Sequence, residues 1–312
     1  MYRIFDILVA SDLPLPELPE EESGSANIYF SLGSHKNYGE QEPIWFHTWP
    51  DPNGQIYISC AHMPENCYLI RYPKLADFHI NSTLDMVHIN PAPQTPPETL
   101  QHLVLDQIIP RILGQLGRLV LHASAIRLKN NTGIAFLGSS GWGKSTLATS
   151  FIQSGSDLIT DDCLLIESRK KNAIGIPSYY GTRLHSDSAD ELFKTPPAWS
   201  RVSHYSDKKR LALPKQSNSK NTVHIDALFL LDQPRIKMNQ QNIEVKQVKG
   251  AEAIMTMIKR TFLMDVKKMD IAAKLFLSAG AIESCGVPIF SLSFPRTYTA
   301  LPDVHKAILT VL

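Results

Sequence analysis

The sequence predicts an α/β protein in two parts, a small β-rich N-terminal domain over residues 1–97 and a larger α/β domain over residues 98–312. Two observations predict the larger part. A short apolar run leads into a glycine-rich loop and a helical pattern, and a second apolar run ends in two adjacent carboxylates. A third observation predicts the β-rich part, since residues 1–97 contain short aromatic and β-branched runs separated by turn residues.

The N-terminal part is expected to be a sheet. Its four clearest apolar runs are expected to be strands at residues 27–31, 43–47, 55–59 and 67–71. Asp51-Pro-Asn-Gly54 has the composition of a hairpin turn. The proline cluster from Pro91 to Pro97 marks the expected domain boundary, because proline neither donates to a sheet ladder nor continues a helix.

Strands and helices alternate along the rest of the chain. A helix is expected over 99–116, with a kink or interruption at Pro110. Further strands are expected at 118–128, 134–137, 157–167, 172–177, 224–231 and 288–293, and further helices at 147–154, 251–264 and 270–279. The polar stretch at roughly 185–221 is expected to be a mobile loop over the functional site.

Gly138-Ser-Ser-Gly-Trp-Gly-Lys-Ser-Thr146 matches G-x-x-x-x-G-K-[ST], the phosphate-binding P-loop. Glycines allow backbone N–H groups to approach phosphate oxygens, and the helix that begins here adds the positive end of its dipole. Lys144 is expected to reach the terminal phosphates, and the Ser145 hydroxyl to bind Mg²⁺. The whole loop is therefore predicted to bind a nucleotide: Gly138, Ser139, Ser140, Gly141, Trp142, Gly143, Lys144, Ser145 and Thr146.

The run Leu158-Ile-Thr160 ends in Asp161 and Asp162, which places two carboxylates at the tip of a strand beside the loop. One carboxylate can orient Mg²⁺ through its water shell while the other accepts a proton from an attacking hydroxyl. Neighbouring side chains of a strand point to opposite faces, so both serve one site only where the strand has already ended. A pair of aspartates that begins a turn is the structural alternative.

Taken together, these segments resemble the HPr serine kinase family, and more closely the HPr-kinase-like proteins of peptide-tailoring clusters, including the lasso-peptide kinases. The resemblance rests on Leu121-His-Ala-Ser124, the loop at 138–146 and Thr160-Asp-Asp162. It continues through residues 180–188, 208–214, 294–296 and the N-terminal Leu13-Pro-Leu-Pro-Glu-Leu-Pro19. It implies a P-loop-containing HPr kinase/carboxykinase-like core. No segment resembles the "RGLGI" signature of classical HPr kinases, so the resemblance does not extend to HPr as substrate or to phosphorolysis.

The resemblance also implies roles for individual residues. Asp161 resembles the carboxylate that deprotonates the acceptor serine, and Asp162 its neighbour on the metal side, so Ser145 and Asp162 are the expected metal ligands. His122 resembles the histidine placed before the P-loop strand, near the transferring phosphate. Positive charge beside that phosphate, which phosphoryl transfer needs, is expected from Arg183, Lys209 and Arg210.

Each of these side chains also has a structural interpretation. His122 lies in a strand-like run where hydrogen-bonded histidines are common, and the run 208–210 is typical of a solvated charge cluster. Arg183 can pair with Asp187 at the surface. Arg296 can be a packing residue, and Trp142 can either shield the phosphates or stack on a partner.

The function predicted is that of a kinase that uses Mg²⁺ and ATP, or GTP, to phosphorylate a serine hydroxyl of a peptide or protein. From the resemblance, a ribosomal precursor peptide of the lasso type is the expected acceptor. A small-molecule phosphotransferase of the carboxykinase type and a non-catalytic, nucleotide-binding regulatory module remain alternatives. The signatures of eukaryotic-type protein kinases are missing from the sequence.

Composition and charge narrow the remaining classes. The net charge of +1 gives no electrostatic case for nucleic acid or an anionic membrane as partner. No apolar run approaches the roughly 20 residues of a membrane span, and residues 1–10 lack the apolar core of a signal peptide. The four cysteines form neither a zinc pair nor a disulfide framework, which favours a cytoplasmic location. Classical relatives form rings, so a homo-oligomer is an open expectation.

Overall fold

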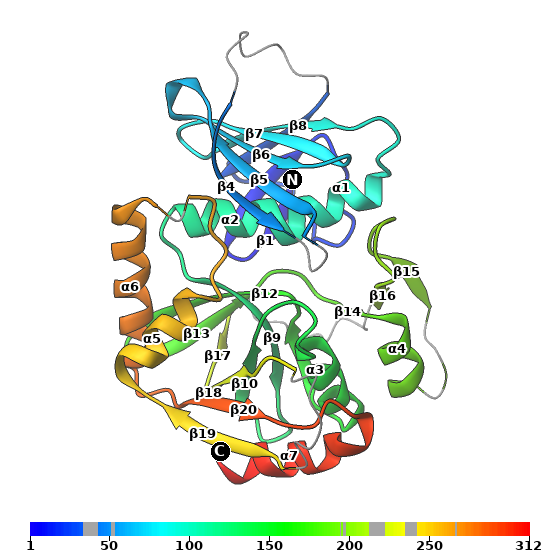
Figure 1. Cartoon of the computed structure of the whole chain (residues 1–312), viewed down its shortest axis with the longest axis vertical. Helices are drawn as coiled ribbons and strands as arrows, with labels where there is room; N and C mark the ends of the chain where they lie inside the picture. Colours follow the sequence, from blue (N-terminus) through cyan, green and yellow to red (C-terminus); the bar gives the residue numbers. More distant parts are fainter. Residues whose placement is uncertain are drawn as a thin grey trace.

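A computed structural model describes residues 1–33, 43–50, 54–193, 195, 198–211, 222–234, 242–265 and 267–312. These residues form a mixed α/β protein with two large sheets and one small one. Figure 1 shows the N-terminal sheet at the top, the second large sheet below it, and the small sheet to one side. Of the predicted hairpin turn at 51–54, residues 51–53 lie outside the described part of the chain.

The N-terminal part forms an eight-stranded sheet in the order β1-β2-β3-β8-β7-β6-β5-β4. Its strands are β1 (Tyr2–Ile4), β2 (Ile7–Ser11), β3 (Ile28–Leu32), β4 (Ile44–Pro50), β5 (Ile56–His62), β6 (Tyr68–Tyr72), β7 (Ala76–Ile80) and β8 (Met86–Pro91). The four predicted strands correspond to β3 to β6. Strands β1, β2, β7 and β8 are not among the predicted strands, although Asp77 and His79 alternate with the buried residues of β7 as is typical of a half-buried strand.

The helix predicted over 99–116 forms as three consecutive segments: α1 (Pro97–Leu103), a π-helical turn (Val104–Ile108) and α2 (Ile109–Gln115). Pro110 lies in the first turn of α2, where a missing N–H is tolerated, so the expected interruption takes the form of the wide turn before it. The apolar side chains of these segments belong to the core of the eight-stranded sheet. The same core includes Val120, Leu165 and Ile176 of the second sheet, so the helix packs between the two sheets.

The second large sheet has the order β17-β13-β12-β9-β10-β18-β20-β19, with β11 paired to β9. Its strands are β9 (Val120–Arg127), β10 (Gly133–Leu137), β11 (Asp157–Thr160), β12 (Cys163–Arg169), β13 (Asn172–Pro177), β17 (Val223–His224), β18 (Ala227–Leu231), β19 (Glu244–Val248) and β20 (Ile289–Ser293). Strands β10, β18 and β20 run parallel, while β9 is antiparallel to β10. The strand predicted over 157–167 is interrupted at Asp161 and Asp162, between β11 and β12.

Helices cover both faces of this sheet, because alternate residues of its central strand β10 are apolar on both sides. Ile134 and Phe136 pack with α3 (Lys144–Gln153) and α7 (Leu301–Thr310). Ala135 and Leu137 pack with α5 (Gly250–Ile258) and α6 (Met269–Glu283). Short 3₁₀ turns lie at Pro64–Asn66 and Tyr298–Ala300. Within the described residues, no helix is both long and apolar enough to cross a membrane.

The polar stretch at 185–221, expected to be a loop, contains a helix and short strands in its described part. It forms α4 (Ser186–Leu192), β15 (Trp199–Arg201) and β16 (Lys209–Leu211). With β14 (Thr182–Leu184), the two strands make a small sheet in the order β14-β16-β15. Strands of three residues that are rich in basic and hydroxyl side chains are too short to show the alternation of apolar and polar residues that predicts a strand. Residues 212–221 lie outside the described part.

The packing of α2 between the two sheets can be tested with one leucine inside the helix and one directly after it. Leu113 is buried in the shared core, whereas Leu116, at the helix end, is 48% exposed. L113A should lower the free energy of unfolding by about 2–5 kcal/mol, because it leaves a cavity. L116A should change it by less than about 0.5 kcal/mol. Urea unfolding measures both, and equal effects would contradict the packing.

Candidate functional site

The glycine-rich loop, residues 138–146, connects the end of β10 to the start of α3. Strand, loop and helix therefore follow one another in the order that the motif requires. Gly141 and Gly143 have φ values of 77° and 86°, the left-handed region that other residues rarely adopt. The loop thus depends on glycine to turn its backbone at these two positions.

Lys144 begins α3 and is buried, with only 4% of its surface exposed. Its Nζ donates to the carbonyl oxygen of Ser139 in the same loop, at 3.1 Å. Burial lowers the pKa of Lys144 to about 8, against the opposing attraction of Asp162. An anion bound in the loop would stabilise the charged ammonium group that burial disfavours.

Asp161 is fully buried in the turn between β11 and β12. Its carboxylate accepts five hydrogen bonds, from the hydroxyls of Ser124, Ser145 and Thr182 and the backbone N–H groups of Asp162 and Arg183. The Ser145 hydroxyl lies 2.9 Å from Oδ1. Burial and the charge of Asp162 raise the pKa of Asp161, while its donors oppose that rise. Both oxygens of Asp161 are occupied by the protein itself.

Asp162 adopts a left-handed backbone conformation with a φ of 62°. This turn separates its side chain from that of Asp161, and Asp162 lines the cavity beside the loop. Its Oδ1 lies 3.6 Å from Nε2 of His122. Burial alone would raise the pKa of Asp162, but Lys208, His122 and Lys144 outweigh it and hold the pKa below the usual range. The cavity therefore contains an ionised carboxylate at neutral pH.

His122 projects from β9 beside Asp162, and its backbone N–H donates to the carbonyl oxygen of Arg260 at 2.8 Å. Its ring lies 5.5 Å from that of Phe262. Burial, together with the charge of Lys144, lowers the pKa of His122 to about 4. At neutral pH the imidazole is therefore uncharged, and its Nε2 lies beside the Asp162 carboxylate.

The expected basic residues lie in different places. Arg183 is fully buried and borders the cavity, and its partners are Glu17, Asp106 and Asp162 in place of a surface pair with Asp187. Lys209 and Arg210 are not among the cavity-lining residues. Both belong to β16 and are engaged elsewhere: Lys209 lies 3.8 Å from Asp190, and Arg210 lies 2.7 Å from Glu17.

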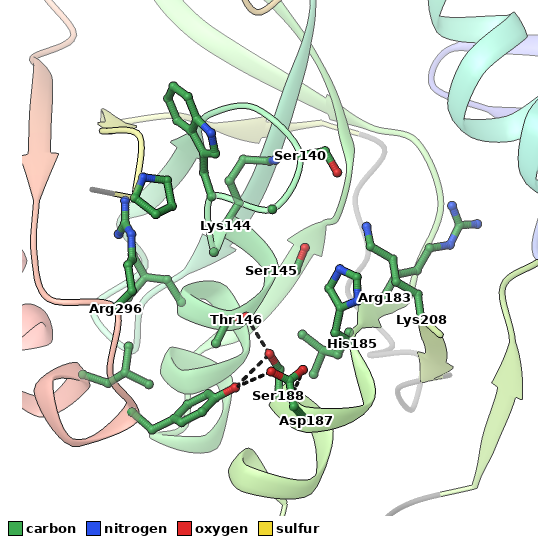
Figure 2. A pocket seen from close by; sticks show the side chains of 18 of the residues that line it. Ser140, Lys144, Ser145, Thr146, Arg183, His185, Asp187, Ser188, Lys208 and Arg296 are labelled. Atoms are coloured by element: carbon green, nitrogen blue, oxygen red, sulfur yellow. Dashed lines mark hydrogen bonds between the residues drawn. The ribbon is translucent and has the colours of Figure 1, made fainter. Parts of the chain in front are cut away.

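The cavity beside the loop has a volume of about 460 Å³ and is shown in Figure 2. Residues 140–146 of the loop line it, as do Asp162, His122 and Arg183. Gly138 and Ser139, the first two loop residues, do not. Lys208 also lines the cavity, and sequence reasoning did not select it. The only sequence signal for Lys208 is its place at the start of the basic run 208–210.

A second group of side chains that borders the cavity comes from α3, α4 and the segment after β20. Hydroxyl groups of Thr146, Ser188 and Tyr298 form a chain, with Thr146 Oγ1 3.3 Å from Ser188 Oγ and Ser188 Oγ 3.1 Å from the Tyr298 hydroxyl. The Tyr298 hydroxyl also donates to Asp187 Oδ2 at 3.5 Å. Arg296 lines the cavity too, with its guanidinium 3.8 Å from the centre of the Phe294 ring. None of these residues was predicted as a nucleotide-site residue except Thr146.

Trp142 has a partner within the chain. The guanidinium of Arg260, which follows α5, lies 4.6 Å from the centre of the Trp142 ring. The same guanidinium donates to the Ser139 hydroxyl at 3.3 Å. Arg260 thus contacts the loop from the face of the sheet that α5 and α6 cover.

The site is suited to a metal held jointly with phosphates. Within the described residues, no group of three or more His, Cys, Asp and Glu side chains is arranged to hold a metal ion alone. Mg²⁺ commonly takes only one or two protein ligands beside substrate phosphates and waters. The expected ligands Ser145 and Asp162 both line the cavity, whereas Asp161 does not line it and accepts a hydrogen bond from the Ser145 hydroxyl at 2.9 Å.

Comparisons with known proteins add little. No family model matches the sequence, and no curated protein matches it. The structure of the Hpr(Ser) kinase/phosphatase from Coxiella burnetii is similar to this chain with a TM-score of 0.33 and 14% sequence identity, over 61% of this chain and 94% of that chain. A TM-score this low carries no argument about fold, reaction or substrate.

Proposed function

We propose that this chain is a kinase that transfers the terminal phosphoryl group of ATP, or GTP, to a serine hydroxyl of a peptide or protein. One observation carries the proposal. An ionised carboxylate, Asp162, faces the same cavity as the glycine-rich loop and the two lysines Lys144 and Lys208. A carboxylate at this place can take the proton of an attacking hydroxyl, a step that nucleotide binding alone does not include.

In this proposal the loop binds the phosphates through its backbone N–H groups, and Lys144 contributes the positive charge nearest to them. Ser145 would hold Mg²⁺ together with phosphate oxygens and waters, and the ion would neutralise charge on the phosphate oxygens. Asp161 accepts the hydrogen bond of the Ser145 hydroxyl and would orient that ligand. Its burial behind Ser145 makes it unsuited to meet an incoming hydroxyl.

Asp162 is the group that accepts the proton of the acceptor hydroxyl, the role expected of Asp161 from the sequence. As the acceptor oxygen forms its bond to the terminal phosphorus, its proton passes to the Asp162 carboxylate. The bond to the bridging oxygen breaks, and its electron pair leaves with the nucleoside diphosphate. Anionic phosphates in the loop offset the cations around Asp162, which raises its pKa toward the range of a useful base.

Lys208 and His122 complete the transfer side of the cavity. Lys208 provides the second positive charge for the transferring group, the role expected of Lys209 and Arg210. His122, which is neutral, orients the Asp162 carboxylate through its Nε2. The acceptor class comes from the sequence resemblance, which favours a serine of a ribosomal precursor peptide. Cytoplasmic location and self-association stay predictions.

Incubation with Mg²⁺ and ATP or GTP, followed by mass spectrometry of candidate acceptors, tests the proposal. A serine-containing precursor peptide should gain the mass of one phosphoryl group. D162N should lower the rate by about 10²- to 10⁴-fold, because it removes the proton acceptor. Nucleotide affinity should be kept or improved in D162N, since the neutral amide no longer repels phosphates.

Asp190→Asn is the matched control, because Asp190 is exposed, pairs with Lys209 and lies outside the cavity lining. It should leave the rate unchanged. Transfer only to small hydroxy compounds would favour the small-molecule phosphotransferase. Nucleotide binding with no transfer to any acceptor would favour the regulatory module and refute the kinase.

Nucleotide binding should also weaken as the pH rises through about 8, the pKa of Lys144. The lysine is charged below this pH and loses its proton above it, so the apparent dissociation constant should rise by up to about tenfold between pH 8 and pH 9. K144R keeps its charge over this window and should show a flat profile. Titration calorimetry measures both, and an equally steep profile in K144R would contradict the role of Lys144.

A further inference from the structure

A buried ion-pair network joins the N-terminal part of the chain to the cavity carboxylate. Its centre is Arg183, whose side chain has no exposed surface. Glu17, in the segment after β2, binds Nη2 of Arg183 at 2.9 Å. Asp106, from the π-helical turn, contacts Nη1, and Asp162 Oδ2 lies 3.9 Å from the same atom. One guanidinium thus meets three carboxylates from three separate segments.

Arg183 also supports the other aspartate of the site. Its backbone N–H donates to Asp161 Oδ2 at 3.0 Å, and its guanidinium lies 4.4 Å from the centre of the Tyr179 ring. A guanidinium is a rigid, planar fork, so its carboxylate partners determine its orientation. The positions of both aspartates therefore depend on how Arg183 is held.

Glu17 also forms an ion pair with a second arginine, Arg210, which does not line the cavity. Its Oε1 lies 2.7 Å from Nη2 of Arg210, and its side chain is only 10% exposed. Leu15 and Leu18, on either side of it, are buried in the core of the N-terminal sheet. Glu17 is not among the residues that line the cavity. It therefore acts on the cavity only through the arginines.

We propose that Glu17 is a positioning residue for phosphoryl transfer: it fixes Arg183, and Arg183 sets the position of Asp162 at the cavity. The inference rests on the proposed kinase function. It makes the N-terminal sheet part of the transfer site, because that sheet determines where Glu17 lies.

The charge of Glu17 matters because Arg183 divides its hydrogen bonds among carboxylates. With Glu17 neutral, the guanidinium is left with Asp106 and Asp162 as its anionic partners. Asp162 is then drawn toward Arg183 and away from the acceptor hydroxyl. The rate of the transfer step should fall. Nucleotide affinity of the glycine-rich loop should stay the same, because Glu17 contacts no loop residue that binds phosphate.

Glu17→Gln and Glu21→Gln make a matched pair within one segment. Glu21 also forms an ion pair, to Arg3 at 2.6 Å, but it has no part in the Arg183 network. E17Q should lower kcat by about tenfold or more, as expected for a displaced catalytic group, with the KM for nucleotide within about twofold. E21Q should leave both constants unchanged. A kcat of E17Q equal to that of the wild type would overturn the proposal, as would a rise in nucleotide KM that accounts for the whole loss.

Hydrogen–deuterium exchange of the full chain gives a readout that does not depend on activity. The Arg183 amide should exchange faster in E17Q than in the wild type, and E21Q should match the wild type. If wild-type protein transfers no phosphoryl group to any acceptor, the kinase function fails, and the exchange experiment still decides whether Glu17 holds Arg183. Unchanged exchange at residues 179–185 in E17Q would refute the positioning role.

Discussion

The hydrogen bonds of one buried carboxylate, Asp161, hold the site together. Its five donors come from β9, the start of α3, the turn itself and β14. A buried charge is tolerated only where its hydrogen-bonding capacity is used, so these elements must meet at this point for the turn to be stable. The same turn gives Asp162 its left-handed backbone and directs it at the cavity. The hydrogen bonds that Asp161 needs thereby determine where Asp162 lies.

The charges around this turn form a second level of support. Arg183 is buried among Glu17, Asp106 and Asp162. Removing one partner of such a buried group leaves an unpaired charge, and this lowers the free energy of unfolding by more than the intact group adds to it. The π-helical turn that supplies Asp106 packs between the two large sheets. The N-terminal sheet is thus connected to the cavity both by apolar packing and by ion pairs, and it is more than an appended domain.

The sequence predicts the features that depend on neighbouring residues, and it misses those that depend on residues far away in the chain. The strand, glycine-rich loop and helix are found because their pattern is continuous in the chain. The roles of the two aspartates cannot be found in this way. They depend on the backbone conformation of Asp162, and on the hydrogen bond from Thr182, which is 21 residues from Asp161 in the chain. For a similar reason, the sequence predicts Lys209 and Arg210 as site residues and does not predict Lys208. Lys208 lies just before β16, whereas Lys209 and Arg210 pair within the small sheet, and a short polar strand does not reveal where it begins or how it pairs.

The cavity has two chemically distinct sides, and this asymmetry gives the proposed reaction a direction. Lys208 lies on the side of the small sheet, where Asp162 is 3.9 Å from Arg183 of β14, and Arg296 and Tyr298 lie in the segment after β20 on the opposite side. In-line transfer places the attacking and leaving oxygens on opposite sides of the phosphorus. Since the proton acceptor is on the first side, the serine would approach from there, and the nucleoside would lie toward the second. The ends of the parallel strands β18 and β20 border that second side, which is where open α/β sheets usually bind their ligands.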